Sequence, residues 1–156
     1  MNHQSFIQLF RESADEAIGT PGYFIRGRRP DASLASIVKD NPIIVLLPFR
    51  ETKDYVKKNI SRQVTMLFLK QDSPGNQKAI DSKDEEMDLR DGIVSEMYGL
   101  LDLFIAALNT RLDSPTSEFY GKGSFGQVLS TPEYGILAGY FTGYGASFTF
   151  NSKMVC

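Results

Sequence analysis

The stretch from Gly139 to Asn151 alternates between two kinds of residue with a period of two. Its even positions from 140 to 150 carry mostly aromatic or apolar side chains, and its odd positions carry glycine, serine, threonine and asparagine, apart from Phe141. This pattern predicts one long β-strand with an aromatic face and a small, polar face. No charged residue lies between Glu133 and Lys153. A long, flat strand with glycines is a poor free edge in a monomer, so we expect a neighbouring subunit to continue or cover its sheet.

Composition predicts one globular domain over residues 1–156, because 42% of the residues are hydrophobic and 23% are charged. A net charge of −2 gives no overall attraction to nucleic acid or anionic lipid. No apolar run approaches the roughly 20 residues that span a membrane, and no signal-peptide pattern opens the chain, so we expect synthesis in the cytoplasm. With one cysteine, Cys156, and one histidine, His3, we expect no disulfide and no histidine–cysteine metal site within a chain.

Residue patterns predict the order helix, three strands, helix, two strands. The expected elements are a helix at 5–18, strands at 22–28, 42–49 and 63–71, a helix at 84–109, and strands at 124–131 and 135–151, the last two joined by a turn at 131–134. The strands at 42–49 and 63–71 are apolar on both faces, which is typical of strands covered on both sides. The fold class is therefore α+β, with a mainly antiparallel sheet of about five strands and both helices on one face. We expect the other connections, at 31–41 and 72–76, to be polar loops.

Both helices carry recognisable end signals. Ser5 is the expected N-cap of the first helix and Gly19 its stop, while Ser82 and Glu85 have the spacing of a capping box for the second. The second helix has an apolar stripe at helical spacing. Its members are Leu89, Ile93, Met97, Leu100, Leu101, Phe104 and Leu108. Gly92 and Gly99 interrupt this helix, and we interpret them as places where another backbone packs closely.

Residues 50–62 are strongly basic and too short for a crossover helix, so we expect a long hairpin. Its cations are Arg50, Lys53, Lys57, Lys58 and Arg62. They could follow a nucleic-acid backbone, but Tyr55 alone could stack on a base, so a solvated or subunit-contacting loop is favoured. With few apolar residues, this segment has little reason to pack on its own domain, and we expect it to become ordered on contact with a partner.

Two other charged groups have two interpretations each. Arg26, Arg28 and Arg29 could bind phosphate, but a contact with an acidic surface of this chain or of a neighbour is favoured. An acidic group marks the start of the second helix. Its members are Asp81, Asp84, Glu85, Glu86, Asp88 and Asp91. Calcium and magnesium motif spacing is absent, so these carboxylates are best interpreted as complements to the helix dipole. Asp84 and Glu85 are then candidate contacts for the basic segments.

No catalytic residue is predicted. The serines do not occur in a nucleophile-elbow pattern, and His3 is the only histidine that could act as a base. An enzyme of this size would need a pocket with convergent polar groups, which the sequence does not display.

The chain resembles a family of small bacteriophage proteins that includes tail terminators and head–tail connector (neck) components. Four stretches carry the resemblance: 23–29, 41–48, 66–74, and 131–134 with the strand 140–150. Lambda-type tail terminators combine an N-terminal helix, a mixed sheet and a second helix, and form hexameric rings that cap the tail tube. This chain differs from them in a longer basic hairpin at 50–62 and a longer final strand.

The resemblance implies a structural virion protein of the neck or tail, with no catalysis and no cofactor. It would form a closed ring between connector or portal-side proteins and tail-side proteins, with six subunits favoured and twelve as the alternative. Genomic DNA would pass through the lumen without sequence recognition. The alternative is a cytoplasmic nucleic-acid-binding module that uses Arg26, Arg28, Arg29 and the basic hairpin, and salt-dependent DNA binding would distinguish it.

Overall fold

The structure, a computed structural model, describes residues 1–27, 41–72, 83–135 and 141–155, and the side chains of 83–87 lie outside this description. The described residues form two helices and a sheet of seven strands. These elements are α1 (His3–Ile18), β1 (Phe24–Arg26), β2 (Ile43–Leu46), β3 (Arg50–Asp54), β4 (Asn59–Gln71), α3 (Lys83–Asp113), β5 (Gly123–Phe125), β6 (Leu129–Gly135) and β7 (Phe141–Lys153). The predicted α+β class is confirmed, with more strands than the five expected.

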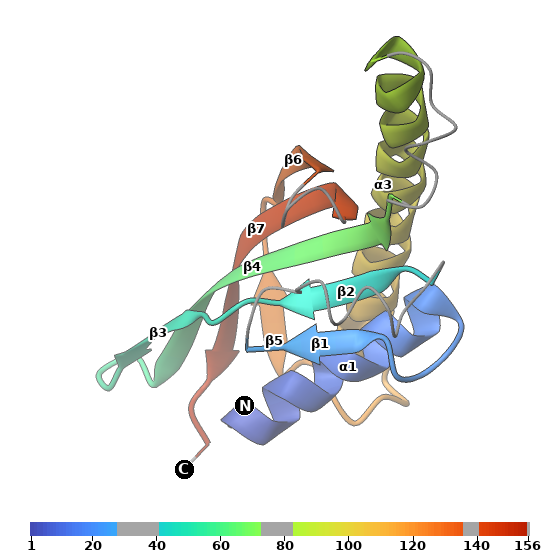
Figure 1. Cartoon of the computed structure of the whole chain (residues 1–156). Coiled ribbons are helices and arrows are strands. Elements are labelled where there is room, and N and C mark those ends of the chain that lie inside the picture. The colour runs from blue at the N-terminus through green and yellow to red at the C-terminus, as the bar shows by residue number, and fades with distance from the viewer. Residues whose placement is uncertain (28–40, 73–82, 136–140, 156) are drawn as a thin grey trace.

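The sheet has the order β1-β2-β4-β7-β5, with β3 also pairing with β4 and β6 with β7. Only β1 and β2 run parallel among the described pairs, so the sheet is mixed. Its centre is the pair β4 and β7, which are hydrogen-bonded from Asn59 opposite Lys153 to Gln71 opposite Phe141 (Figure 1). Each of these strands has 13 residues, about 40 Å at roughly 3.3 Å per residue.

The long final strand is not an edge of the sheet. β4 pairs with one side of β7, and β5 and β6 pair with the other. The expectation that a neighbouring subunit continues the sheet at this strand is therefore wrong, whereas the expectation that a neighbour covers its face stays a prediction. The predicted turn at 131–134 is wrong too, since these residues belong to β6, where Pro132 lies opposite Tyr144. Pro132 is tolerated because, among the described strands, β6 pairs with β7 alone.

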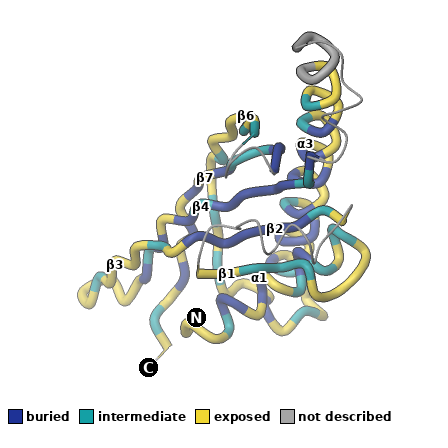
Figure 2. The backbone as a smooth tube through the Cα atoms, viewed as in Figure 1, coloured by how far each residue is buried: buried dark blue, intermediate teal, exposed yellow. Residues whose placement is uncertain are grey.

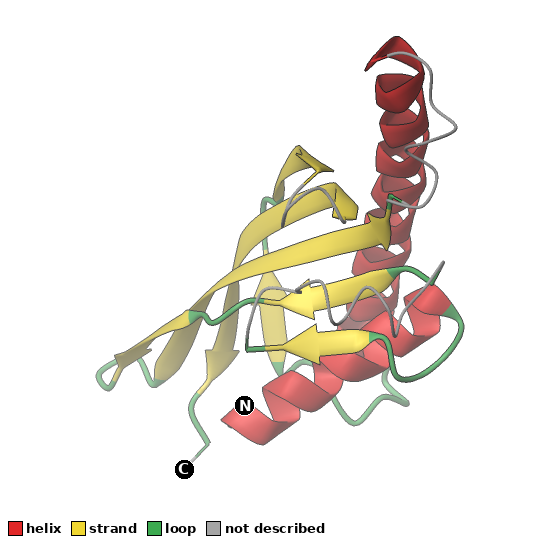
Figure 3. Cartoon of the chain, in the orientation of Figure 1, coloured by secondary structure: helices red, strands yellow, loops and turns green. Residues whose placement is uncertain are grey.

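Both helices pack on one face of the sheet, as predicted (Figure 3). This face takes the even-numbered side chains of the long strands, among them Val64, Met66 and Phe68 of β4 and Phe148 and Phe150 of β7. The other face is divided (Figure 2). Its apolar part is a smaller buried cluster of Ile43, Val45, Leu47, Leu67, Leu69 and Phe141. Its polar part continues along β4 and β7, where odd-numbered residues such as Gln63, Thr149 and Asn151 are exposed.

The ends of α1 correct one prediction and confirm another. The N-cap is Asn2 rather than Ser5, since the Asn2 side chain accepts a hydrogen bond from the Ser5 backbone N–H at 2.8 Å. Gly19 ends the helix with φ +85°, and its N–H donates to the Asp15 carbonyl. A left-handed residue of this kind is the usual C-terminal stop, and glycine adopts it without strain.

The apolar stripe of α3 is buried along most of its length, but Leu89 is 43% exposed. The interpretation of its glycines is wrong, because a Cβ at Gly92 or Gly99 would meet no atom of another described element within 4 Å. Close approach occurs instead at Gly143 of β7, where a Cβ would lie 1.8 Å from the Phe68 carbonyl oxygen. No helix in the described residues is long and apolar enough to cross a membrane.

Candidate assembly surface

Residues 50–62, the hairpin arm, project away from the helices at one end of the sheet (Figure 1). β3 pairs with the first part of β4, from Arg50 opposite Gln63 to Asp54 opposite Asn59. The predicted hairpin is confirmed. The expectation that it becomes ordered only on contact is wrong, because the arm is hydrogen-bonded within its own chain. Its second strand also joins the main sheet, where Ile60 is buried opposite Ser152 of β7.

The hairpin tip, residues 54–59, is shaped by a local turn. Asp54 Oδ1 accepts hydrogen bonds from the backbone N–H groups of Val56 at 3.0 Å and Lys57 at 2.9 Å. Lys58 adopts φ +55°, a conformation that reverses the chain here at the cost of some backbone strain. This turn leaves Tyr55 73% and Val56 93% exposed. The tip therefore presents two apolar side chains in a fixed turn, next to two lysines.

Arg62 is not a surface cation, which corrects its predicted role as a partner contact. It is 1% exposed, because it follows the even, core-facing parity of β4. Its guanidinium donates to Glu51 Oε2 at 2.9 Å, to Ser152 Oγ at 3.0 Å and to the Met1 carbonyl at 2.9 Å. It also lies 4.8 Å from the centre of the Phe6 ring. Arg62 thus joins β3, β4, β7 and the start of α1.

The other predicted cations are exposed. Arg50, Lys53, Lys57 and Lys58 share the hairpin arm, while Arg26 lies at the end of β1. Lys53 Nζ is 3.7 Å from Glu51 Oε1, and both side chains are partly exposed, a kind of pair that contributes little to stability. Arg26 lines an open groove of about 530 Å³ at the root of the arm, with an apolar floor that includes Leu46 and Phe49. Four of the predicted contact residues therefore gather on one projecting element.

Several predictions fall outside the described part of the chain. Arg28 and Arg29 lie there, as do the Ser82 cap and nearly all of the two connections at 31–41 and 72–76. Asp84 and Glu85 belong to the first turns of α3, but their side chains are not described.

A second open groove, the helix–strand groove, lies between the first described turns of α3 and the end of β4. It measures about 400 Å³ and is lined by Lys70, Gln71, Asp88, Leu89, Gly92, Ile93 and Glu96. Lys70 Nζ contacts both Glu96 oxygens at 3.1 Å. The groove is acidic, because two carboxylates, Asp88 and Glu96, line it together with one cation, Lys70. Leu89 and Ile93 provide apolar surface, and the missing side chain of Gly92 opens space between them.

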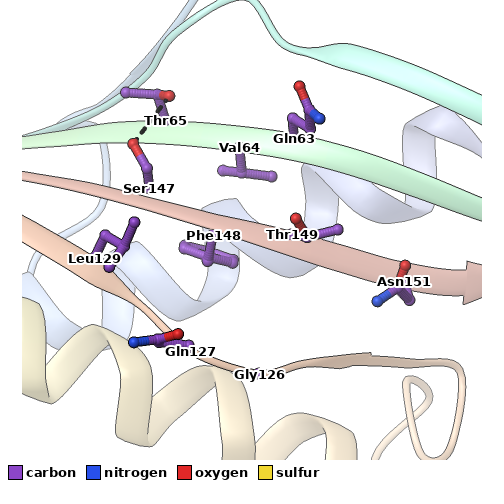
Figure 4. A pocket seen from close by; sticks show the side chains of 10 residues that line it. All are labelled: Gln63, Val64, Thr65, Gly126, Gln127, Leu129, Ser147, Phe148, Thr149 and Asn151. Atoms are coloured by element: carbon purple, nitrogen blue, oxygen red, sulfur yellow. Dashed lines mark hydrogen bonds between the residues drawn. The ribbon is translucent and has the colours of Figure 1, made fainter.

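The polar part of the sheet face forms a third groove, of about 610 Å³ (Figure 4). Side chains of β4 and β7 line it together with the segment from Gly126 to Leu129. The Thr65 and Ser147 hydroxyls share a hydrogen bond at 3.3 Å across its floor. None of the residues that line it is ionisable. The groove therefore lacks any group that could act as a general acid or base.

The buried carboxyl of Asp72 forms the centre of a polar network at the end of β4. Asp72 Oδ2 accepts hydrogen bonds from Arg90 Nε at 2.9 Å and from Thr142 Oγ1 at 2.7 Å, and Thr142 Oγ1 accepts from the Gly135 N–H at 3.0 Å. Burial raises the pKa of Asp72, although the bonds from Thr142 and Arg90 act in the opposite direction. This network ties α3 to β4, β6 and β7, and it holds α3 in place beside the helix–strand groove.

We expect Arg90→Met to destabilise the protein more at neutral than at acidic pH. A raised pKa means that the folded state holds the Asp72 proton more tightly than the unfolded chain, so stability falls as pH rises above about 3.9, the ordinary value for Asp. Loss of Arg90 raises the pKa further and enlarges this fall. Urea unfolding should show a deficit of about 1–3 kcal/mol at pH 7, which shrinks toward pH 4.5. Arg90→Lys, which keeps the charge, should show a smaller deficit, and an Arg90→Met deficit that does not change with pH would contradict this role.

Comparison of the sequence with known protein families finds no match, and comparison with proteins of established function finds none either. Among the described residues, no three histidine, cysteine or acidic side chains come together as a metal site would require.

Proposed function

We propose that this chain is a structural virion protein that forms a ring at the head–tail junction or at the end of the tail tube of a bacteriophage. The observation that carries the proposal is the hairpin arm, which ends in two exposed apolar side chains, Tyr55 and Val56. Exposed apolar side chains at the end of a projecting, hydrogen-bonded arm are typical of a surface that another molecule covers. Four exposed cations on the same arm would give that contact its orientation.

The two ends of the molecule support a ring rather than a two-fold dimer. The basic hairpin tip lies at one end of β4 and the acidic helix–strand groove at the other (Figure 1). Contacts between two unlike surfaces are heterologous, and they generate rings when the rotation between subunits closes. The family resemblance favours six subunits over twelve, docked between connector or portal-side proteins and tail-side proteins.

The grooves support a structural role rather than catalysis. The groove on the polar part of the sheet face has no ionisable lining residue. The acidic groove holds a partly exposed lysine–glutamate pair, and none of its described lining residues is a serine, threonine or cysteine.

DNA contact is the second candidate, favoured by the exposed Lys57 and Lys58 beside Tyr55. In a ring, these residues would meet the DNA backbone in the lumen without reading sequence. In the alternative function, a cytoplasmic nucleic-acid-binding module, they would bind DNA as an isolated protein. Phosphate contacts lose affinity steeply as salt rises. Tight, salt-sensitive binding of a short duplex by a monomer would favour this alternative over the ring.

We expect the double variant Tyr55→Ser, Val56→Ser to lose self-association and keep the wild-type fold. Both side chains are exposed, so the thermal midpoint should stay within about 2 °C, as is usual for surface substitutions. Sedimentation velocity should show the variant as a monomer at concentrations where the wild type is assembled. Tyr120→Ser, which changes an exposed aromatic residue outside both the arm and the lining of the helix–strand groove, should leave assembly intact. Unchanged assembly of the double variant would contradict the role of the tip.

A further inference from the structure

We infer that the hairpin tip of one subunit docks into the helix–strand groove of the next, with Tyr55 and Val56 against Leu89 and Ile93. This inference rests on the proposed ring and names the contact that builds it. The occupant of the groove is a second copy of this chain. Three features of the described residues support this choice: the apolar side chains of the two surfaces, their opposite charges, and their positions at opposite ends of β4.

The apolar parts of the two surfaces complete each other. The tip offers Tyr55 and Val56 to solvent, and the groove offers the exposed Leu89 beside the buried Ile93. Gly92 lies between these two residues in sequence, and a Cβ there would meet no described atom within 4 Å outside the helix's own backbone. A glycine inside a helix costs about 1 kcal/mol relative to alanine, and no contact within the described residues explains that cost. Space for a side chain inserted by the neighbouring subunit explains why the helix has glycine at this position.

The charges are complementary. Lys57 and Lys58 stand beside the apolar pair of the tip, and Lys53 lies on the strand that leads to it. The groove carries Asp88 and Glu96 against Lys70. Opposite charges around an apolar centre are the usual arrangement of a specific protein contact, in which the apolar anchors supply affinity and the charges set orientation.

The position of the two surfaces excludes a contact within one chain. The tip ends at Asn59, the first residue of β4, whereas the groove includes Lys70 and Gln71 at the end of that strand. A strand of this length separates them by about 40 Å. Each subunit therefore contributes one tip and one groove. Every tip and every groove is occupied only if the row of subunits closes into a ring.

The test is a pair of engineered cysteines in the full chain, with the native thiol removed by Cys156→Ser. Val56→Cys with Leu89→Cys should form disulfides between subunits on mild oxidation, because docking brings the two Cα atoms within the 4.4–6.8 Å that a disulfide spans. Denaturing electrophoresis without reductant should then show a ladder that ends at the ring number. The matched control pairs Val56→Cys with Leu103→Cys. Leu103 is 58% exposed on the same helix, about 21 Å further along at 1.5 Å per residue, and should not cross-link.

A second measurement tests the charges. Lys57→Glu should weaken assembly about tenfold or more, and adding Asp88→Lys should restore it, because the pair then meets with its signs exchanged. Assembled protein that cross-links at neither pair, or equally at both, would overturn the inferred contact and leave the ring proposal standing. A protein that stays monomeric by mass would overturn the ring and this contact together.

Discussion

Replacing Phe104 with alanine should lower the free energy of unfolding by about 3–5 kcal/mol, the usual range for truncating a buried aromatic side chain. Phe104 is fully buried on α3, with ring centres 5.7 Å from Phe10 of α1 and 5.5 Å from Phe68 of β4. Its ring therefore packs against both the other helix and the sheet. The cavity left by alanine would remove contacts from three elements at once, and packed interiors relax only partly around such a gap.

Chemical denaturation of Phe104→Ala and Leu103→Ala makes this a matched comparison. The two residues are neighbours on α3, but Leu103 faces solvent, so its truncation should cost less than about 0.5 kcal/mol. A loss below about 1 kcal/mol for Phe104→Ala would mean that α3 does not cover the sheet with this face.

Arg62→Ala should cost about 3 kcal/mol, the second-largest effect we expect, because it leaves buried partners without their donor. Glu51, Ser152 and the Met1 carbonyl each accept from this guanidinium. The Glu51 side chain is 27% exposed and regains part of its hydration, which places the cost at the lower end of the range for broken buried ion pairs. The hairpin arm should also become more mobile, since Arg62 anchors its root to the body.

Two variants separate this role from that of a surface charge. Arg50→Ala removes an exposed cation from the same arm and should change stability by less than about 0.5 kcal/mol. Arg62→Lys keeps the charge but lacks the planar fork that reaches three acceptors, so it should recover only part of the loss. Equal stabilities for Arg62→Ala and Arg50→Ala would contradict the anchoring role of Arg62 and would mean that it behaves as a surface charge.

The alternation of apolar and polar residues in the long strands was sufficient to predict most of the fold. The period of two in residues 140–151 placed Phe148 and Phe150 on the core face. The apolar run at 42–49 correctly indicated a strand buried on both faces, although the strand itself is shorter, Ile43–Leu46. The same parity rule, applied to Ile60, Arg62, Val64 and Met66, would have assigned Arg62 to the core. The charge of Arg62 favoured a surface position instead, because arginine is rarely buried unless it is paired. Its pairing could not be read from the sequence, since two of its acceptors lie 61 and 90 residues away.

Other errors have physical causes of the same kind. A strand is an edge or a centre according to what pairs with it, so sequence could not show that β5 and β6 flank β7. A glycine in a helix does not reveal whether a backbone or open space lies beside it. The interpretation of Gly92 as a site of close backbone packing is wrong for this reason. The Asp72 network joins residues 18 and 70 positions apart, and neither Asp72 nor Thr142 belongs to a motif.

The candidate site was only partly predictable. Sequence identified the hairpin and four of its exposed cations, because a basic run between apolar strands has few other forms. It did not identify Tyr55 and Val56 as the contact residues, since their exposure depends on the turn that Asp54 caps. The helix–strand groove depends on how α3 crosses the end of β4, which no local pattern encodes.

Native mass spectrometry of the purified full chain tests the central claim, the head-to-tail ring, most directly. We expect one dominant species at six times the 17.4 kDa mass of the chain, without the series of intermediate sizes that an open filament would give. A closed species of twelve chains would keep the ring and change its number. A monomer, or a two-fold dimer, at micromolar concentration would contradict the account.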